Sequence, residues 1–294
     1  MTLYALRQTI RYDFNRPTGA GRQLFRILPA DIPGVQRVRD VHYDFAPEVG
    51  ERGTFRDFFG TRVIEAAMPP GLVSLDLTMQ AVVERAVDDS LLDLSPPLEG
   101  LAAEVAACRG VGPDSPHHFT QPSRRIAAAP RIADFARAHA AAGLTVRGLV
   151  EALGRAVHAH MAFDAEATHV DTAPEAAFAL QRGVCQDFAQ IMVGGLRALG
   201  VPAAYVAGYL RTLPPPGQPR LIGADAMHAW VRAWAGAETG WIDYDPTNAC
   251  FVRNDHIDVG FGRDYDDVAP VTGRLRLDGH HSGSHSVDIE EIAA

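Results

Sequence analysis

Residues 183–189 read Gly-Val-Cys-Gln-Asp-Phe-Ala and open an apolar stretch that predicts a helix from Cys185 to Leu199, ended by Gly200 and Pro202. A cysteine at a helix N-terminus lies at the positive end of the helix dipole and beside unpaired backbone amides, and both favour the nucleophilic thiolate. The same amides can stabilise an oxyanion. Cys185 is therefore a candidate nucleophile, with a buried structural cysteine as the alternative.

Two neighbours of Cys185 have predicted structural roles. Gly183 is expected to let the chain enter the helix at an angle that other residues would resist. Asp187 is expected to bind the free amides of the first turn, because acidic side chains are favoured at that end of a helix.

A histidine and two aspartates follow the candidate nucleophile. Residues 228–234 read His-Ala-Trp-Val-Arg-Ala-Trp and predict a strand, and residues 240–247 read Gly-Trp-Ile-Asp-Tyr-Asp-Pro-Thr and predict its antiparallel neighbour. His228 can act as a base toward a thiol, and a carboxylate hydrogen-bonded to the other side of the imidazole can hold it in the required tautomer. Asp243 and Asp245 point the same way, so alternation does not choose between them. Each group alone is also consistent with an ordinary hydrogen-bonded histidine or a solvated carboxylate.

The chain divides into β-rich and helix-rich parts. Residues 1–90 predict an antiparallel sandwich-like domain, and residues 91–130, rich in proline and glycine, predict a connecting segment with a short helix at 101–108. Residues 131–265 place helices before antiparallel strands, and residues 266–294 predict a tail with one or two strands. This order indicates an α+β fold rather than alternating βαβ units. The other elements expected are strands at 3–12, 38–45, 72–83, 203–210, 229–234 and 241–245, and helices at 132–142, 146–161 and 174–182.

The composition excludes several classes of protein. The 294 residues, 47% hydrophobic and 21% charged, are typical of a globular chain. With 27 Lys and Arg against 36 Asp and Glu, the net charge of −9 argues against a nucleic-acid partner. The three cysteines, Cys108, Cys185 and Cys250, form no C-x-x-C pair and fit a reducing compartment. No secretory signal core and no apolar run of roughly 18–20 residues is present, so we expect a soluble, cytoplasmic protein without a membrane partner.

Histidines occur in small groups, but none predicts a metal site. His158 and His160 diverge on their predicted helix, and the groups at 117–118 and 280–285 lack cysteines or paired carboxylates at ligand spacing. The chain contains no glycine-rich phosphate loop and no dinucleotide fingerprint. We therefore expect neither a metal nor a cofactor.

Taken together, residues 183–188, 228–231 and 240–247 resemble the motifs of the transglutaminase-like cysteine hydrolases, a papain-like superfamily with a Cys-His-Asp triad. In that family the acid belongs to the Asp-Pro-Thr element, which implies Asp245 rather than Asp243. The implied fold of this half is a catalytic core of helices packed on an antiparallel sheet.

The resemblance extends to a bacterial subfamily with an N-terminal β domain. Residues 10–14 and 38–45 resemble that domain, and residues 260–271 resemble the segment after its catalytic core. The likeness therefore covers nearly the whole chain.

The resemblance implies acyl transfer from a peptide or carboxamide to Cys185, through a thioester that water or a second amine releases. Hydrolysis is favoured over crosslinking, since the sequence reveals no site that holds an acceptor amine away from water. Gln186 or a tryptophan indole is the implied second oxyanion donor. Trp230 and Tyr209 are expected either to wall the substrate cleft or to be core aromatics. The alternative function is a catalytically inactive protein of this fold that acts as a peptide-binding or interaction module.

Overall fold

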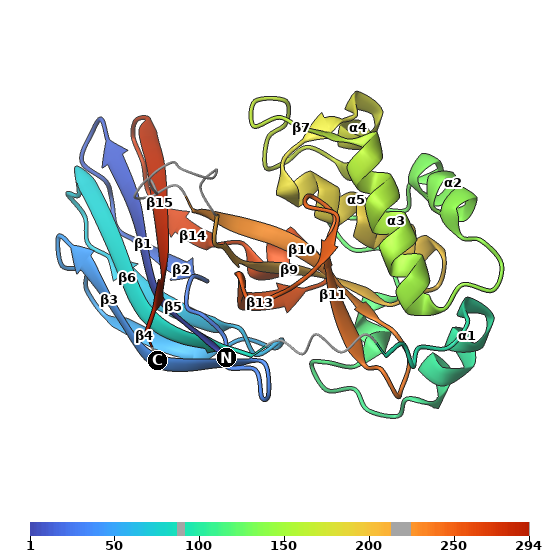
Figure 1. Ribbon diagram of the computed structural model, residues 1–294. Coiled ribbons are helices and arrows are strands. Elements are labelled where there is room, and N and C mark those ends of the chain that lie inside the picture. Colours follow the sequence, from blue (N-terminus) through green and yellow to red (C-terminus); the bar gives the residue numbers. More distant parts are fainter. Residues whose placement is uncertain (87–91, 213–224, 294) are drawn as a thin grey trace, which may run out of the picture.

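The computed structural model describes residues 1–86, 92–212 and 225–293. Its elements form an α+β fold, as the sequence predicts, with two four-stranded sheets at one end and a five-stranded sheet covered by helices at the other (Figure 1). The predicted boundary between residues 90 and 91 lies outside the described residues. None of the helices in the described ranges is both long and apolar enough to cross a membrane.

Two antiparallel sheets build a β-sandwich from both ends of the chain. In spatial order, one contains β15 (His281–Ile292), β1 (Thr2–Phe14), β6 (Ser74–Arg85) and β3 (Gln36–Ala46), and the other contains β14 (Val271–Leu275), β2 (Gly21–Phe25), β5 (Arg62–Met68) and β4 (Arg52–Arg56). The alternation along β6 places Leu75, Leu77 and Met79 in the buried core between the sheets. The sequence separates residues 266–294 as a tail, whereas the structure places two parts of it, β14 and β15, as edge strands of the two sandwich sheets.

The five-stranded sheet carries the candidate site residues. Its antiparallel order is β12 (Cys250–Phe251), β11 (Trp241–Asp245), β10 (Ala226–Trp234), β9 (Ala203–Leu210) and β13 (His256–Gly262). Ala229, Val231 and Ala233 of β10 belong to the core beneath α5 (Cys185–Ala198), because small alternating side chains let a helix pack directly on a sheet. The neighbouring helices are α2 (Pro130–His139), α3 (Val146–His160) and α4 (Pro174–Leu180).

The proline-rich connection packs against the helical side. It contains α1 (Leu98–Ala107), close to the predicted short helix, and a 3-10 turn at Pro116–Phe119. Leu101 and Ile126 are buried in the helical core. The remaining short elements are β7 (Ala162–Phe163), β8 (Arg182–Gly183) and α6 (Tyr265–Val268).

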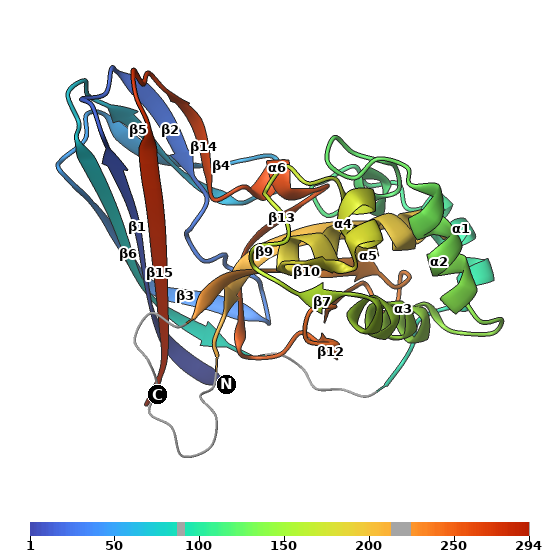
Figure 2. The same ribbon diagram turned by 90° about the horizontal axis from the view of Figure 1, so that it is seen from above.

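The five-stranded sheet lies beside the sandwich, as Figure 2 shows from above, and the boundary between them is buried. Ile257 and Val259 of β13 are fully buried in the apolar core of the sandwich. Arg85 of β6 forms a buried ion pair with Asp258 of β13, with Nη1 and Oδ2 2.6 Å apart. The two units therefore pack as one body around the candidate site.

Candidate active site

The candidate nucleophile is the first residue of α5. The amides of the first two residues of this helix have no acceptor within it, whereas that of Asp187 donates to the carbonyl of Val184 at 2.8 Å. Oδ2 of Asp187 accepts hydrogen bonds from the Val184 amide at 2.9 Å and the Thr168 hydroxyl at 2.6 Å. Burial raises the pKa of Asp187, and these two hydrogen bonds oppose that rise. Asp187 thus fixes the turn that precedes Cys185, which confirms its predicted role at the helix end.

Gly183 is required for a different reason than the sequence suggested. Its φ is not positive, so its backbone conformation is open to other residues. A Cβ atom at this position would lie 2.4 Å from Oδ2 of Asp187. The close approach of the buried carboxylate, rather than an unusual chain direction, therefore selects glycine.

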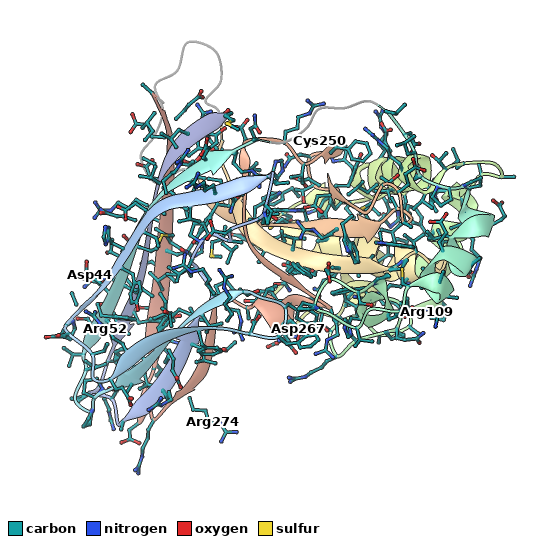
Figure 3. All side chains as sticks on the ribbon, turned by 90° about the horizontal axis from the view of Figure 1, so that it is seen from below. Asp44, Arg52, Arg109, Cys250, Asp267 and Arg274 are labelled. Atoms are coloured by element: carbon teal, nitrogen blue, oxygen red, sulfur yellow. The ribbon has the colours of Figure 1, made fainter. Side chains whose placement is uncertain are left out.

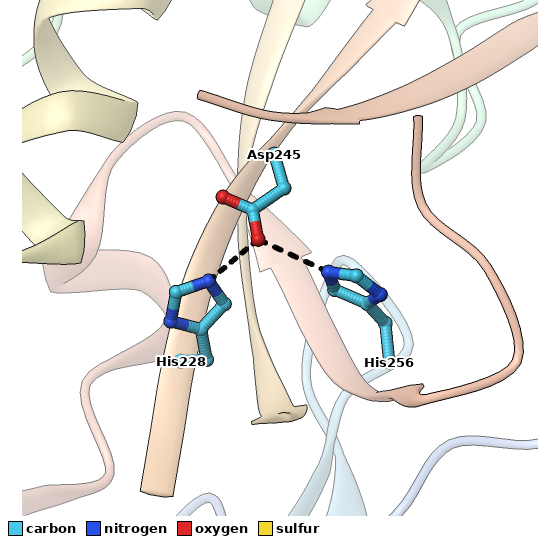
Figure 4. Close-up of side chains that lie close together, drawn as sticks. All are labelled: His228, Asp245 and His256. Carbon is cyan, nitrogen blue, oxygen red and sulfur yellow. Dashed lines mark hydrogen bonds and ion pairs between the residues drawn. The ribbon is translucent and has the colours of Figure 1, made fainter. Parts of the chain in front are cut away.

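A hydrogen bond joins His228 to Asp245 across the sheet. Nε2 of His228 lies 2.8 Å from Oδ2 of Asp245 (Figure 4). Oδ1 of Asp245 accepts from the amides of Thr247 and Asn248 at 2.8 and 3.2 Å. The carboxylate is completely buried, so these partners fix its orientation.

The structure distinguishes the two aspartates of β11. The carboxylate of Asp243 forms two 2.7 Å hydrogen bonds with Arg232 and accepts the indole N–H of Trp230 at 3.4 Å. Asp243 therefore neutralises Arg232, and Asp245 is the aspartate that contacts His228.

The charges of His228 and Asp245 stabilise each other. Burial alone lowers the pKa of His228, but its hydrogen bonds to Asp245 and Cys185 outweigh that effect and raise the pKa to about 10. Burial alone raises the pKa of Asp245, but hydrogen bonds from His228 and His256 hold it well below its usual range. At neutral pH the site therefore favours an imidazolium between a carboxylate and the thiol of Cys185.

His256 is a site residue that the sequence did not reveal. Its Nε2 donates to Oδ2 of Asp245 at 3.1 Å, and its Nδ1 faces the Arg253 amide at 3.4 Å, so the neutral ring carries its proton on Nε2 (Figure 4). Trp230 packs edge-on against the ring, with centroids 5.3 Å apart. Asp245 is thus held between two imidazoles.

A cavity of about 490 Å³ opens beside Cys185 and His228. Gln186 and Tyr205 line it from the catalytic side, and β1 and β15 line it from the sandwich. Nε2 of Gln186 donates to the carbonyl of Val170 at 3.0 Å. Gln186 therefore lines the cavity with its amide held by Val170, and its contact with a substrate stays a prediction.

Trp230 and Tyr209 do not line this cavity, so the expectation that they wall the cleft is corrected. Trp230 is fully buried behind the histidines, and its indole N–H faces Asp243 rather than the cavity. Tyr209 is fully buried at the sandwich boundary, where its hydroxyl donates to the carbonyl of Ile27 at 2.6 Å. Both are core aromatics.

The other two cysteines also lie outside the cavity lining. Cys250 is on the edge strand β12 (Figure 3), where burial, reinforced by nearby Asp245, raises the pKa of its thiol to about 11. Cys108 follows α1. Of the three cysteines, Cys185 is the one that hydrogen-bonds to the His228 imidazole.

Two family models match the chain. The transglutaminase-like superfamily matches residues 133–246, and the bacterial transglutaminase-like N-terminal region matches residues 4–84. Residues 133–246 form a transglutaminase-like domain. Cys185, His228 and Asp245 all lie within the first match.

Relatives of this chain occur in several bacteria. An uncharacterised protein of Mycobacterium tuberculosis, Rv2569c, is 37% identical over 209 residues, which is 66% of this chain and 65% of that protein, so less than two thirds of its length is covered. A protein-glutamine gamma-glutamyltransferase of Pseudomonas aeruginosa is 40% identical over 82 residues, 28% of this chain and 12% of that protein. The solved structure of a proposed cysteine protease from Cytophaga hutchinsonii covers 100% of this chain and 91% of its own, with a TM-score of 0.76 and 20% identity, which shows a shared fold.

The hydrogen-bonded cluster around Asp245 also contains three side chains of metal-binding types. Within the described ranges, His228, Asp245 and His256 are the group whose ligand atoms, all within 4.8 Å of one another, could hold an ion. Both Nε2 atoms already hydrogen-bond to Oδ2 of Asp245, and an ion would have to displace both contacts. These contacts fit a hydrogen-bonded cluster.

Proposed function

We propose that the protein is a cysteine-dependent enzyme that hydrolyses a peptide or carboxamide bond through a thioester. The observation that carries this proposal is the hydrogen-bonded His228–Asp245 pair beside Cys185, at the start of a helix and on the wall of one cavity. The transglutaminase-like domain at residues 133–246 supports the same chemistry.

The proposed reaction follows from the positions of these groups. The Cys185 thiolate attacks the carbonyl carbon, and the oxyanion that forms is held by the Cys185 amide. Since Nε2 of His228 faces Asp245, its Nδ1 gives a proton to the leaving nitrogen as the C–N bond breaks, which leaves a thioester. Neutral His228 then takes a proton from water, the hydroxide adds to the thioester, and Cys185 departs as thiolate. Asp245 keeps its charge throughout and stabilises the imidazolium.

Gln186 is the proposed second oxyanion donor. It lines the cavity next to Cys185, and one hydrogen of its amide nitrogen is bound by Val170. An amide nitrogen has two hydrogens, so one remains for the substrate oxygen. Replacing Gln186 by Met, which adds no charge beside Cys185, should lower kcat while the labelling of Cys185 by iodoacetamide is unchanged; an unchanged kcat would remove Gln186 from this role.

Hydrolysis is proposed over transfer because the cavity is open to water. Gly283 and His285 line it and are exposed, so water reaches the thioester. The name of the Pseudomonas aeruginosa relative favours transfer to an amine instead. Incubation with a glutamine peptide and a fluorescent primary amine distinguishes the two, since hydrolysis gives free glutamate and transfer gives a labelled peptide.

The reactivity of Cys185 tests the enzymatic proposal directly. Iodoacetamide at neutral pH should label Cys185 faster than Cys108 or Cys250, as mass spectrometry of the digested protein would show. The raised pKa of Cys250 predicts slow labelling at that residue. His228→Ala should remove the advantage of Cys185. Equal labelling of all three thiols would favour an inactive protein of this fold.

We further propose a peptide or protein as substrate and the cytoplasm as the location. The three cysteines are free in the structure, which is consistent with a reducing compartment. Fractionation of the source cells followed by immunoblotting tests the location, and recovery outside the cytoplasmic fraction would contradict it.

A further inference from the structure

Two strands that meet at one end leave a wedge beside the catalytic residues. Asp225, just before β10, forms a bridge with Val287 of β15, and its carboxylate accepts the Ile289 amide at 2.7 Å. Beyond that contact β10 pairs with β9, whereas β15 stays on β1. The cavity lies in this wedge, with His228 on one side and residues 283–285 on the other.

β15 turns unpaired main-chain groups toward the wedge. It is the edge strand of its sheet, and the amide of Ile289 points away from β1 because it donates to Asp225. Since main-chain direction alternates along a strand, the N–H and C=O groups of Val287, His285 and Gly283 point to the same outer side. Val287 is bridged, but no described residue pairs with the outer groups of Gly283 and His285, which we call the open edge.

The adjacent face of this sheet contributes another unpaired polar group. Gln8 and Tyr12 of β1 line the cavity beside the open edge. One end of the Gln8 carboxamide is bonded to the Tyr209 hydroxyl, and the other, although fully buried, has no partner among the residues described. That end is closed to solvent, so it can bind a peptide backbone only if the side chain moves into the cavity; a backbone then satisfies either orientation of the amide, since it supplies both donors and acceptors.

We propose that the substrate is an extended peptide whose main chain pairs with the open edge and so presents its reacting carbonyl to Cys185. Outward main-chain groups two residues apart on a strand repeat about every 6.8 Å, which matches the spacing of alternate residues in an extended peptide. Pairing of this kind recognises backbone more than side chains, so it selects loops and unfolded segments. The inference rests on the proposed function, because Cys185 must be the attacking atom.

Peptides that carry an alkylating group test the pairing without requiring turnover. The probe is Val-Thr-Val-Thr amide with an iodoacetyl group at its N-terminus, or on the side chain of an added C-terminal diaminopropionate, because the strand direction is open. The rate of Cys185 alkylation is compared with that of iodoacetamide. At least one probe should react several-fold faster, and N-methylation of successive residues in that probe should remove the gain at every second position only.

Two replacements at one residue separate main-chain from side-chain recognition. His285→Pro removes an outward N–H and should lower the peptide rate by about five- to tenfold, since the hydrogen bond that this N–H donates to the peptide is lost. His285→Ala keeps that N–H and should retain the peptide rate. Both variants should react with iodoacetamide as the unchanged protein does, which shows that the catalytic residues remain folded.

The outcomes distinguish the two proposals. Peptide probes no faster than iodoacetamide, a gain without the two-residue pattern, or equal losses in both His285 variants would each overturn pairing at the open edge. If the unchanged protein is a dimer by analytical ultracentrifugation and His285→Pro is a monomer, a second copy occupies the edge and the inference is also wrong. Labelling of Cys185 by iodoacetamide no faster than of Cys108 contradicts the proposed function instead.

Discussion

Replacement of His256 tests the hydrogen-bonded cluster most directly. Its Nε2 lies 3.1 Å from Oδ2 of Asp245, the same oxygen that His228 contacts at 2.8 Å. In His256→Phe the ring can still pack against Trp230, but the buried carboxylate loses one donor. A hydrogen bond to a charged group contributes about 1.5–3 kcal/mol. If the transition state loses this stabilisation, kcat falls by roughly ten- to one-hundredfold.

The assay separates positioning from simple loss of stability. His256 does not line the cavity, so KM for a small amide substrate should stay nearly constant while kcat falls. His256→Gln is the matched control, because its amide N–H can replace the Nε2–H donor and should restore most of kcat. Urea denaturation should show a loss of about 2 kcal/mol in the Phe variant alone. Full kcat in His256→Phe, or equal losses in both variants, would refute the role of His256 in positioning Asp245.

Three further predictions concern the charges around His228. Asp245→Asn should lower the pKa of His228 by on the order of two units. The alkaline limit of kcat/KM, expected near pH 10 in the unchanged protein, should then move to lower pH. The pKa of His228 in the folded protein lies above its ordinary value of 6.5, so the pair with Asp245 stabilises the fold fully just below pH 6.5 and loses this effect as the pH rises toward 10. Urea denaturation across this range should therefore show a decline in the free energy of unfolding, and Asp245→Asn should flatten that decline. Asp243→Asn should lower the free energy of unfolding by on the order of 2 kcal/mol, because it weakens the pair with Arg232, but it should leave the alkaline limit of kcat/KM in place. A shift of that limit would contradict separate roles for the two aspartates.

The elements that could be predicted are those whose two faces differ in polarity or whose ends are marked. β6 alternates over its whole length, and α5 ends before Gly200 and Pro202, so each has a local signal. The two-residue strands β7, β8 and β12 are too short for periodicity to detect. The pairing of β14 with β2 and of β15 with β1 joins opposite ends of the chain, and no local sequence pattern predicts such pairing.

The same distinction applies to the site. Cys185 and His228 each belong to a recognisable local pattern, whereas His256 begins β13, which pairs with β9 and not with β11. Its contact with Asp245 therefore depends on tertiary packing. Tyr205 and Tyr209 share one face of β9, but the first lines the cavity and the second is buried at the sandwich boundary. Because the strand twists, residues on the same face but at different positions along it have different neighbours, and alternation alone does not predict which of them lines the cavity.

The sandwich is part of the site as well as a neighbour of it. β1 and β15 form one wall of the cavity, and Arg85 of β6 is a buried counter-ion of Asp258. Asp258 also contacts Arg232 at 3.1 Å, and Arg232 binds Asp243, so alternating charges run from the sandwich to the strand that ends in Asp245. Breaking a buried pair leaves an uncompensated charge, which costs about 3–5 kcal/mol. The catalytic strands therefore cannot shift against the sandwich without losing such contacts, and the geometry around Asp245 depends on both units.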